Sequence, residues 1–191
     1  YTIGYDTAMN TAMDMVDRIR DTAQSHDRCS VVEVMGRNAG YIALNTGIAV
    51  GASYILVPEM KPDMDAVLEK IEKSRALGKK HFIIVVAEGI GHAKEIAQEI
   101  EEKTGVESRA TVLGHIQRGG SPSAYDRVLS TQFGVHAAQL IRDEHYGVTV
   151  ALKGNKIIHN DLKDVAGVPK PVPMDDPVVV TARNMGINMG D

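Results

Sequence analysis

The chain has 191 residues, of which 43% are hydrophobic and 24% are charged, and its formal net charge at pH 7 is −4. This length and apolar share suffice for one sizeable core or two small lobes, and they exclude a disordered chain. General nucleic-acid binding needs a basic face that a mildly acidic chain lacks, and no apolar run approaches the length of a membrane span, so we expect neither partner.

The first 116 residues alternate between helical and strand patterns. A helical period of apolar residues predicts a helix from about Asp6 into the polar residues 20–27, and a valine-rich run predicts a buried strand over 29–35. The same reasoning predicts a helix from residue 38 to about Gly51, further helices over 63–78 and 92–105, and further strands over 54–59, 81–89 and 108–116. Strict alternation favours an α/β fold, with a parallel sheet covered by helices on both faces.

The pattern changes after Gly120. Residues 123–144 predict a long helix opened by a Ser-Pro-Ser sequence. Residues 148–161 predict two strands joined at Gly154–Asn155, a hairpin signal. A proline-rich connector over 167–174 leads to a short helix over 177–186, with Pro177 in its first turn.

The single cysteine, Cys29, begins a predicted buried strand, where a small buried residue is the simplest interpretation. One cysteine excludes an internal disulfide framework and suits a reducing cytoplasm. The N-terminus at Tyr1 has no initiator methionine, no basic region and no apolar signal core. We therefore expect a cytoplasmic chain that is part of something longer.

Polar side chains beside glycines follow three of the predicted strands. Arg37 follows the first strand, Glu88 the third, and His115 and Arg118 the fourth. Ligands of open parallel sheets bind at the carboxyl ends of the strands. Guanidinium groups bind phosphate through paired hydrogen bonds, and a carboxylate accepts hydrogen bonds from sugar hydroxyls. The combination favours a phosphorylated, hydroxyl-rich ligand.

Each of these residues alone has a simpler explanation. An arginine after a strand is often a surface charge, Glu88 could cap the helix that follows, and His115 could be a satisfied polar residue at a strand end. What favours a site is the joint occurrence of polar groups beside glycine at three strand ends.

A second group of cations lies at the opposite edge of the predicted sheet. Lys79, Lys80 and His81 precede the third predicted strand, and Arg20 lies near the end of the first helix. They form a second candidate anion site, although from the residues alone a solvated lysine turn is the simpler interpretation.

The segments "YTIGYDTA", "SVVEVMGRNAG", "VVAEG" and "RATVLGHIQRGGSPSAYDR" together resemble the bacterial ATP-dependent 6-phosphofructokinases. The resemblance covers nearly all of the chain and is fainter after about Lys163. It implies a phosphofructokinase-like fold with a substrate-binding lobe over 1–116. A segment over 117–167 would return to the ATP-binding lobe, and a C-terminal tail with a short helix would occupy 168–191.

The resemblance implies transfer of the terminal phosphoryl group of ATP, with Mg²⁺, to the 1-hydroxyl of fructose 6-phosphate in glycolysis. The implied sugar-phosphate site consists of Met35, Gly36, Arg37, Glu88, His115 and Arg118. Arg37 would also stabilise charge on the transferring phosphoryl group. Arg28 and Arg109 match two arginines that reach into the sugar site of a neighbouring subunit, which implies a homo-oligomer, in this family a homotetramer.

Two motifs of the family do not occur in this sequence. "GGDGS" binds phosphates and magnesium, and "TIDND" carries the catalytic aspartate. Tyr1 corresponds to a point shortly after the second motif. The resemblance therefore implies an incomplete, substrate-binding C-terminal portion that holds no metal or cofactor by itself and is inactive alone.

The second cation group matches the family's allosteric site, which binds ADP or phosphoenolpyruvate between subunits. The implied effector residues are Arg20, Gly51, Ala52, Ser53, Lys79, Lys80 and His81. Ser53 stands where many members carry a glutamate that helps hold the nucleotide's magnesium, and Leu77 stands where some carry another lysine. Losing a metal ligand and a cation should weaken the response to ADP.

Two other interpretations stay open. A pyrophosphate-dependent phosphofructokinase would use the same sugar site, because the residues that select the donor lie outside this chain. A non-catalytic sensor that binds a phosphorylated ligand is the alternative from another class. The residues before Tyr1 in the gene would discriminate, since "TIDND" supports an enzyme and an ordinary start codon supports a sensor.

Overall fold

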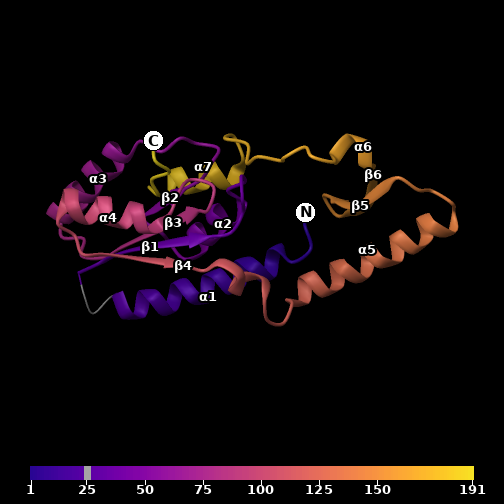
Figure 1. Ribbon diagram of the computed structural model, residues 1–191, viewed down its shortest axis with the longest axis horizontal. Coiled ribbons are helices and arrows are strands. Elements are labelled where there is room, and N and C mark those ends of the chain that lie inside the picture. The colour runs from indigo at the N-terminus through magenta and orange to yellow at the C-terminus, as the bar shows by residue number, and fades with distance from the viewer. Residues whose placement is uncertain (24–26) are drawn as a thin grey trace. The chain divides into compact units, whose positions relative to one another are not determined.

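The computed structural model describes residues 1–23 and 27–191, which form two compact units (Figure 1). The larger unit comprises Met9–Gln117 and Lys170–Asp191, and the smaller unit comprises Tyr1–Ala8 and Arg118–Pro169. The first predicted helix is α1 (Tyr5–Ala23), and residues 24–26 of that prediction lie outside the described residues. The predicted division at 116 and 167 refers to lobes of a whole enzyme and stays a prediction.

A four-stranded parallel sheet forms the centre of the larger unit, in the order β2-β3-β1-β4. Its strands are β1 (Cys29–Val34), β2 (Tyr54–Leu56), β3 (Phe82–Ala87) and β4 (Ser108–Val112). Every residue of β1, β2 and β3 is buried. Burial on both faces explains why these strands read as continuous apolar runs.

Helices cover both faces of this sheet (Figure 1). One face packs against α3 (Met64–Ala76) and α4 (Ala93–Thr104), and the other against α2 (Tyr41–Ala49), α7 (Pro177–Asn184) and the larger-unit part of α1. Successive strand side chains point to opposite faces. Val31 therefore packs in the core on the side of α3 and α4, and Val32 packs in the core on the side of α2 and α7. The predicted α/β fold is confirmed. None of the helices in the described ranges is long and apolar enough to cross a bilayer.

Element boundaries follow local capping where the sequence carries it. The Asp63 carboxylate accepts the amide of Ala66 at 3.1 Å and caps α3, as its position predicts. The fourth predicted strand is too long, because the strand ends at Val112 and the short 3-10 helix η1 (Gly114–Arg118) follows. Gly114 adopts φ 51°, a left-handed conformation that breaks the extended chain before His115.

The smaller unit consists of α5 (Ala124–Arg142), the antiparallel hairpin β5 (Val148–Lys153) and β6 (Lys156–Asp161), and the short α6 (Leu162–Val165). The hairpin turns at Gly154–Asn155, with Lys153 opposite Lys156, so this prediction is confirmed. Helix α6 has four residues and was not predicted.

A buried carboxylate links the start of the chain to the start of α5. Asp126 is 1% exposed, and its Oδ2 accepts hydrogen bonds from the Thr7 amide, at 2.8 Å, and the Thr7 hydroxyl. The same hydroxyl accepts the amide of Ser123, the N-cap of α5, at 3.0 Å. An N-cap serine and an acidic residue at N3 usually pair directly as a capping box. Here the Ser123 hydroxyl accepts the Asp126 amide directly, at 3.3 Å, and Thr7 relays only the contact between the Asp126 carboxylate and the Ser123 amide.

The hydrogen bonds at Asp126 make its charged form contribute to stability. Burial raises the pKa of Asp126, but hydrogen bonds from the Thr7 side chain and amide and from the Gly4 amide outweigh it, and the net pKa is lowered. The ionised carboxylate therefore stabilises the fold above the pKa that it has when unfolded. This contribution disappears as the pH falls through the lowered pKa of the folded state.

Thr7→Val removes the relaying hydroxyl while keeping the side-chain shape. We expect the free energy of unfolding to fall by about 1–3 kcal/mol, because a buried carboxylate loses a donor. Thr7→Ser keeps the hydroxyl and should lose much less. Asp126→Asn should flatten the acid-induced loss of stability below about pH 4. Urea unfolding across acidic and neutral pH measures both effects, and equal losses in the valine and serine variants would contradict the relay.

Cys29 is fully buried on β1. Burial raises the pKa of its thiol to about 12, and a hydrogen bond with Ser108 offsets this only in part. The thiolate is the reactive form of cysteine, so the native thiol is both inaccessible and uncharged. The predicted buried position is confirmed.

We expect Cys29 to resist an aromatic disulfide reagent in the native chain at neutral pH. One equivalent should react once the chain is unfolded in guanidinium chloride. Absorbance of the released thiolate measures both stages. A native reaction as fast as the unfolded one would mean that β1 is open to solvent.

Candidate functional site

The carboxyl edge of the sheet brings together predicted site residues of the larger unit. Met35 directly follows β1, Glu88 directly follows β3, and His115 lies in η1 after β4. The β1–β3 ladder continues one step past the strands, because the Glu88 amide donates to the Val34 carbonyl at 2.9 Å. Since β1, β3 and β4 are parallel, all three chain segments leave the sheet at the same edge.

The Glu88 carboxylate holds the loop that follows β1. Its Oε1 accepts the amide of Arg37 at 2.6 Å and the amide of Gly36 at 3.2 Å. Its Oε2 makes no hydrogen bond within the described ranges. Arg37 adopts φ 52°, a left-handed conformation that residues other than glycine seldom take. The two amide hydrogen bonds offset the strain of that conformation.

Gly89 and Gln117 fix the same loop from two other sides. A Cβ atom at Gly89 would lie 2.1 Å from the carbonyl oxygen of Arg37, so the two backbones can approach only if residue 89 is glycine. Gln117, which is 1% exposed, accepts the amide of Met35 at 2.8 Å through Oε1. The backbone of residues 35–37 is therefore held by three residues, Glu88 and Gly89 directly after β3 and Gln117 in η1.

Two further carboxylates bind backbone amides at this edge. Glu33, 9% exposed on β1, accepts the amide of Ala93 at the start of α4 at 2.9 Å. Glu59 accepts the amide of Gly40, the residue before α2, at 3.0 Å. Both carboxylates lie at a helix N-terminus, where the helix dipole favours negative charge. These amides are thus used within the protein.

The side chains of Arg37 and His115 are exposed at this edge. The amides of residues 35–37 are engaged internally, so the exposed side chains of Arg37 and His115 are groups through which this edge can bind an anionic ligand. Arg118 is also exposed but belongs to the smaller unit. Its part in the site stays a prediction.

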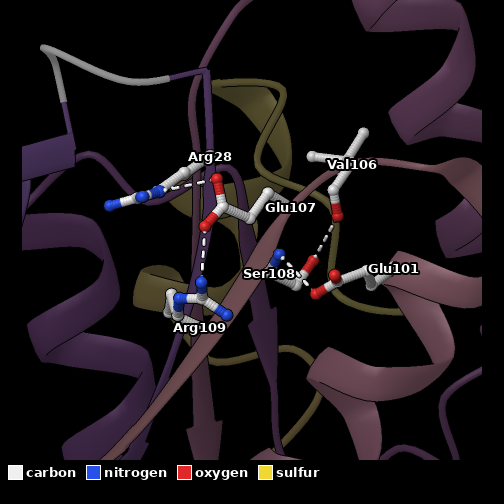
Figure 2. Close-up of polar contacts among 6 residues, drawn as sticks. All are labelled: Arg28, Glu101, Val106, Glu107, Ser108 and Arg109. Carbon is white, nitrogen blue, oxygen red and sulfur yellow. Dashed lines mark hydrogen bonds and ion pairs between the residues drawn. The ribbon is translucent and has the colours of Figure 1, made fainter.

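Arg28 and Arg109 share one carboxylate, that of Glu107 (Figure 2). Arg28 Nε lies 2.9 Å from Glu107 Oε2, and Arg109 Nη2 donates to Glu107 Oε1 at 2.6 Å. Arg28 directly precedes β1, and Arg109 is the second residue of β4. The two arginines predicted to reach a neighbouring subunit are thus paired within their own chain.

The residues predicted to bind an effector lie at the amino edge of the sheet. Arg20 is near the end of α1, residues 51–53 precede β2, and residues 79–81 precede β3. The amides of residues 51–53 donate to the carbonyls of Ile48, Gly47 and Ile83. These amides are therefore engaged within the protein, as is the Ser53 carbonyl, which accepts the Asn188 amide at 3.2 Å.

A cavity of about 260 Å³ lies beside two of these predicted cations. Lys79 and Lys80 line it together with Arg75, Asp27 and Phe82. The Lys79 ammonium is 5.4 Å from the centre of the Phe82 ring, and burial lowers the pKa of this lysine. Arg20, Ser53 and His81 do not line the cavity, so the predicted effector residues are only partly brought together.

Three positioning residues were not found from the sequence. Glu33 carried a signal, because it is the one charged residue in an otherwise apolar strand pattern. Glu107 gave no signal, since its pairing depends on the register of β1 against β4. Gln117 gave none either, because nothing local marks it as buried.

Comparison with known proteins places the chain. A family model described as phosphofructokinase matches residues 1–141. The chain is 52% identical over 165 residues to the ATP-dependent 6-phosphofructokinase of Halalkalibacterium halodurans, a match that covers 86% of this chain and 52% of the relative. The chain thus spans about half the length of the curated relatives that it matches.

Solved structures agree with this placement. The phosphofructokinase of Saccharomyces cerevisiae matches with a TM-score of 0.81 and 36% identity, covering 86% of this chain and 23% of that one. The pyrophosphate-dependent phosphofructokinase of Marinobacter aquaeolei matches with a TM-score of 0.74 over 98% of this chain and 51% of that one, and at 21% identity it shows the fold alone. The chain belongs to the phosphofructokinase family.

Proposed function

We propose that this chain supplies the fructose 6-phosphate-binding part of an ATP-dependent 6-phosphofructokinase. The enzyme phosphorylates the 1-hydroxyl of the sugar and yields fructose 1,6-bisphosphate in glycolysis. The observation that carries the proposal is the hold of Glu88 on the left-handed loop of Arg37, at the carboxyl edge of a parallel sheet. The 52% identity with a relative named for this activity supports it.

The two carboxylate oxygens of Glu88 have different roles in this proposal. Oε1 fixes the amides of Gly36 and Arg37. Oε2, without an internal hydrogen bond in the described ranges, is open to accept one from a sugar hydroxyl. The fixed backbone orients the Arg37 guanidinium, whose charge stabilises the negative charge of the transferring phosphoryl group. His115 and Arg118 bind the 6-phosphate by charge-assisted hydrogen bonds.

The reaction joins the 1-hydroxyl oxygen of the sugar to the terminal phosphorus of ATP, ADP leaves, and the hydroxyl proton passes to a base. In the part of the chain that the structure describes, no group of three or more His, Cys, Asp or Glu side chains could hold a metal ion. The one carboxylate of the proposed sugar site, Glu88, holds backbone amides through Oε1, so these residues are assigned to the sugar and not to the magnesium of ATP. The chain binds and orients the acceptor sugar and stabilises charge.

Identity favours ATP over pyrophosphate as the donor. The support is the name of the 52% identical relative, which is ATP-dependent 6-phosphofructokinase. We also propose a cytoplasmic homotetramer in which Arg28 and Arg109 reach the sugar site of a neighbouring subunit. ADP or phosphoenolpyruvate would act at the amino edge of the sheet.

Glu88→Ala in the complete enzyme tests the proposed site. We expect the KM for fructose 6-phosphate to rise about 10- to 100-fold, the cost of losing charge-assisted hydrogen bonds, and kcat to fall because Arg37 loses its backbone support. Glu88→Gln keeps an acceptor oxygen and should lose less. The KM for ATP should change little. A coupled assay with each substrate varied measures the two KM values and kcat.

Glu95→Ala is the matched control, because Glu95 carries the same charge on the exposed surface of α4. It should behave like the unaltered enzyme. An unchanged KM for fructose 6-phosphate in Glu88→Ala would refute the proposed function.

The effector proposal makes a separate prediction. The amides of residues 51–53 donate to carbonyls of the protein. A substitution that is meant to add a ligand contact in this loop must therefore act through a side chain, and position 53 is the one where a carboxylate would add a magnesium ligand. Ser53→Glu adds a magnesium ligand for bound ADP and should strengthen activation by ADP. Adding Leu77→Lys, at a position that is 90% exposed, should strengthen it further.

The measurement is the shift in half-saturation for fructose 6-phosphate with and without magnesium-ADP. Gln98→Lys is the control for Leu77→Lys, because it adds the same positive charge on the exposed face of α4, and it should not change the response to ADP. Strong activation of the unaltered enzyme, with no change in the double variant, would show that these positions do not govern the response.

A further inference from the structure

Three of the seven histidines of the chain lie together in the smaller unit. His136 is on α5, His145 follows the end of α5, and His159 is on β6. His136 Nε2 lies 3.4 Å from His159 Nδ1, and the two rings are stacked with their planes 24° apart. The His145 ring packs edge-on against the His159 ring, with the ring centres 4.7 Å apart. The proposed function uses none of these three side chains.

The spacing of half-buried residues on α5 explains how His136 reaches the hairpin. Phe133, His136, Ala137 and Leu140 are half-buried, while the residues between them are exposed. Positions that recur every three or four residues lie on one face of a helix. Helix α5 contacts both strands of the β5–β6 hairpin, which lies alongside it (Figure 1). The contact with His159 shows that His136 belongs to this hairpin-facing side of α5.

The turn that ends α5 positions His145. The Glu144 amide donates to the Ile141 carbonyl at 3.1 Å, and the His145 amide donates to the Leu140 carbonyl at 2.8 Å. This pair of hydrogen bonds is the Schellman motif, which usually has glycine at its left-handed position. Here Glu144 takes that conformation, with φ 52°, at a cost in conformational energy. The turn fixes the backbone of His145, whose ring contacts that of His159.

The hairpin holds His159 from the other side. His159 lies opposite Val150 in the antiparallel ladder, away from the turn. At the far end of the ladder, the Leu162 amide donates to the Gly147 carbonyl at 2.9 Å. The backbones that carry the three imidazoles are therefore each fixed by hydrogen bonds.

We propose that His136 Nε2 and His159 Nδ1 bind a zinc ion. Imidazole nitrogen is a preferred ligand of zinc. Two nitrogens at about 2.0–2.1 Å from a tetrahedral zinc ion lie about 3.3–3.4 Å apart, and the separation of these two nitrogens is 3.4 Å. A ligating nitrogen must be unprotonated, so the histidine that donates the present hydrogen bond takes its other tautomer when the ion binds.

This site has two protein ligands and is open to solvent. In the described ranges no group of three or more His, Cys, Asp or Glu side chains could hold a metal ion. Water therefore fills the remaining positions around the zinc. Closed structural sites have four protein ligands, so this ion binds less tightly and exchanges with the solution. His145 is a positioning residue, because its ring restricts the rotation of the His159 ring.

Zinc bound to both nitrogens connects α5 to β6 within the smaller unit. An ion that binds only the folded chain stabilises it by mass action, so zinc should stabilise the packing of the hairpin on α5. This proposal rests on the contacts of the smaller unit alone and is independent of the proposed function.

The test titrates the 191-residue chain with zinc chloride and follows the heat by calorimetry. His136→Asn and His159→Asn should each weaken zinc binding at least about tenfold, because even the outer-shell partners of metal ligands contribute about 10- to 100-fold to affinity. His92→Asn is the matched control, since His92 is an exposed histidine of the larger unit. It should leave the affinity unchanged. An unchanged affinity in either of the first two variants, or an equal loss in the control, would overturn the proposal.

His145 separates a ligand from a positioning residue. His145→Phe keeps an aromatic ring without a nitrogen and should bind zinc as the unaltered chain does. His145→Ala should weaken binding about two- to tenfold, the contribution of an aromatic pair. A loss in His145→Phe as large as that in His159→Asn would overturn the assignment of two ligands.

NMR tests the site without depending on the folding of any variant. In the unaltered chain, zinc should shift the ¹⁵N signals of His136 Nε2 and His159 Nδ1 and leave those of His92 in place. Zinc should also raise the urea midpoint of the unaltered chain but not that of His159→Asn. The absence of a shift at either ligating nitrogen, or an equal rise of the midpoint in His159→Asn, would overturn the proposal.

Discussion

The position of β1 between β3 and β4, parallel to both, is the constraint on which the rest of the larger unit depends. Parallel pairing sends every strand out of the sheet at the same edge, so loops from distant parts of the sequence meet there. It also gathers the strand beginnings at the opposite edge. Arg37 and His115 lie at the first edge, whereas Arg28 and Lys79 lie at the second. The fold thereby separates two groups of cations that the sequence interleaves.

Carboxylates have different partners at the two edges. At the carboxyl edge, Glu33, Glu59 and Glu88 accept backbone amides. They stiffen the loops and leave the guanidinium of Arg37 exposed. At the amino edge, Glu107 pairs with guanidinium groups directly. The same side-chain type therefore supports a cation at one edge and neutralises two cations at the other.

The sheet was predictable from the sequence because β1 and β3 are buried on both faces and so consist mainly of apolar residues. Asp63 and the Gly154–Asn155 turn were predictable because their contacts are local. The relay through Thr7 was not, since its partners lie more than a hundred residues away in sequence. The residues of the candidate site were likewise predictable from the sequence. The left-handed backbone of Arg37 was not, because it depends on hydrogen bonds with Glu88, which lies far away in the sequence.

The close approach of Gly89 to the carbonyl oxygen of Arg37 limits which residues position 89 can hold. Position 89 cannot accept even alanine while the neighbouring loop keeps its path, because the 2.1 Å separation leaves no room for a side chain. A substitution of this glycine would require the loop of residues 36–37 to take another path. That change would also move the backbone that carries the Arg37 guanidinium. Glycine at 89 and the course of residues 36–37 therefore depend on each other, because a side chain at position 89 would displace the Arg37 carbonyl oxygen.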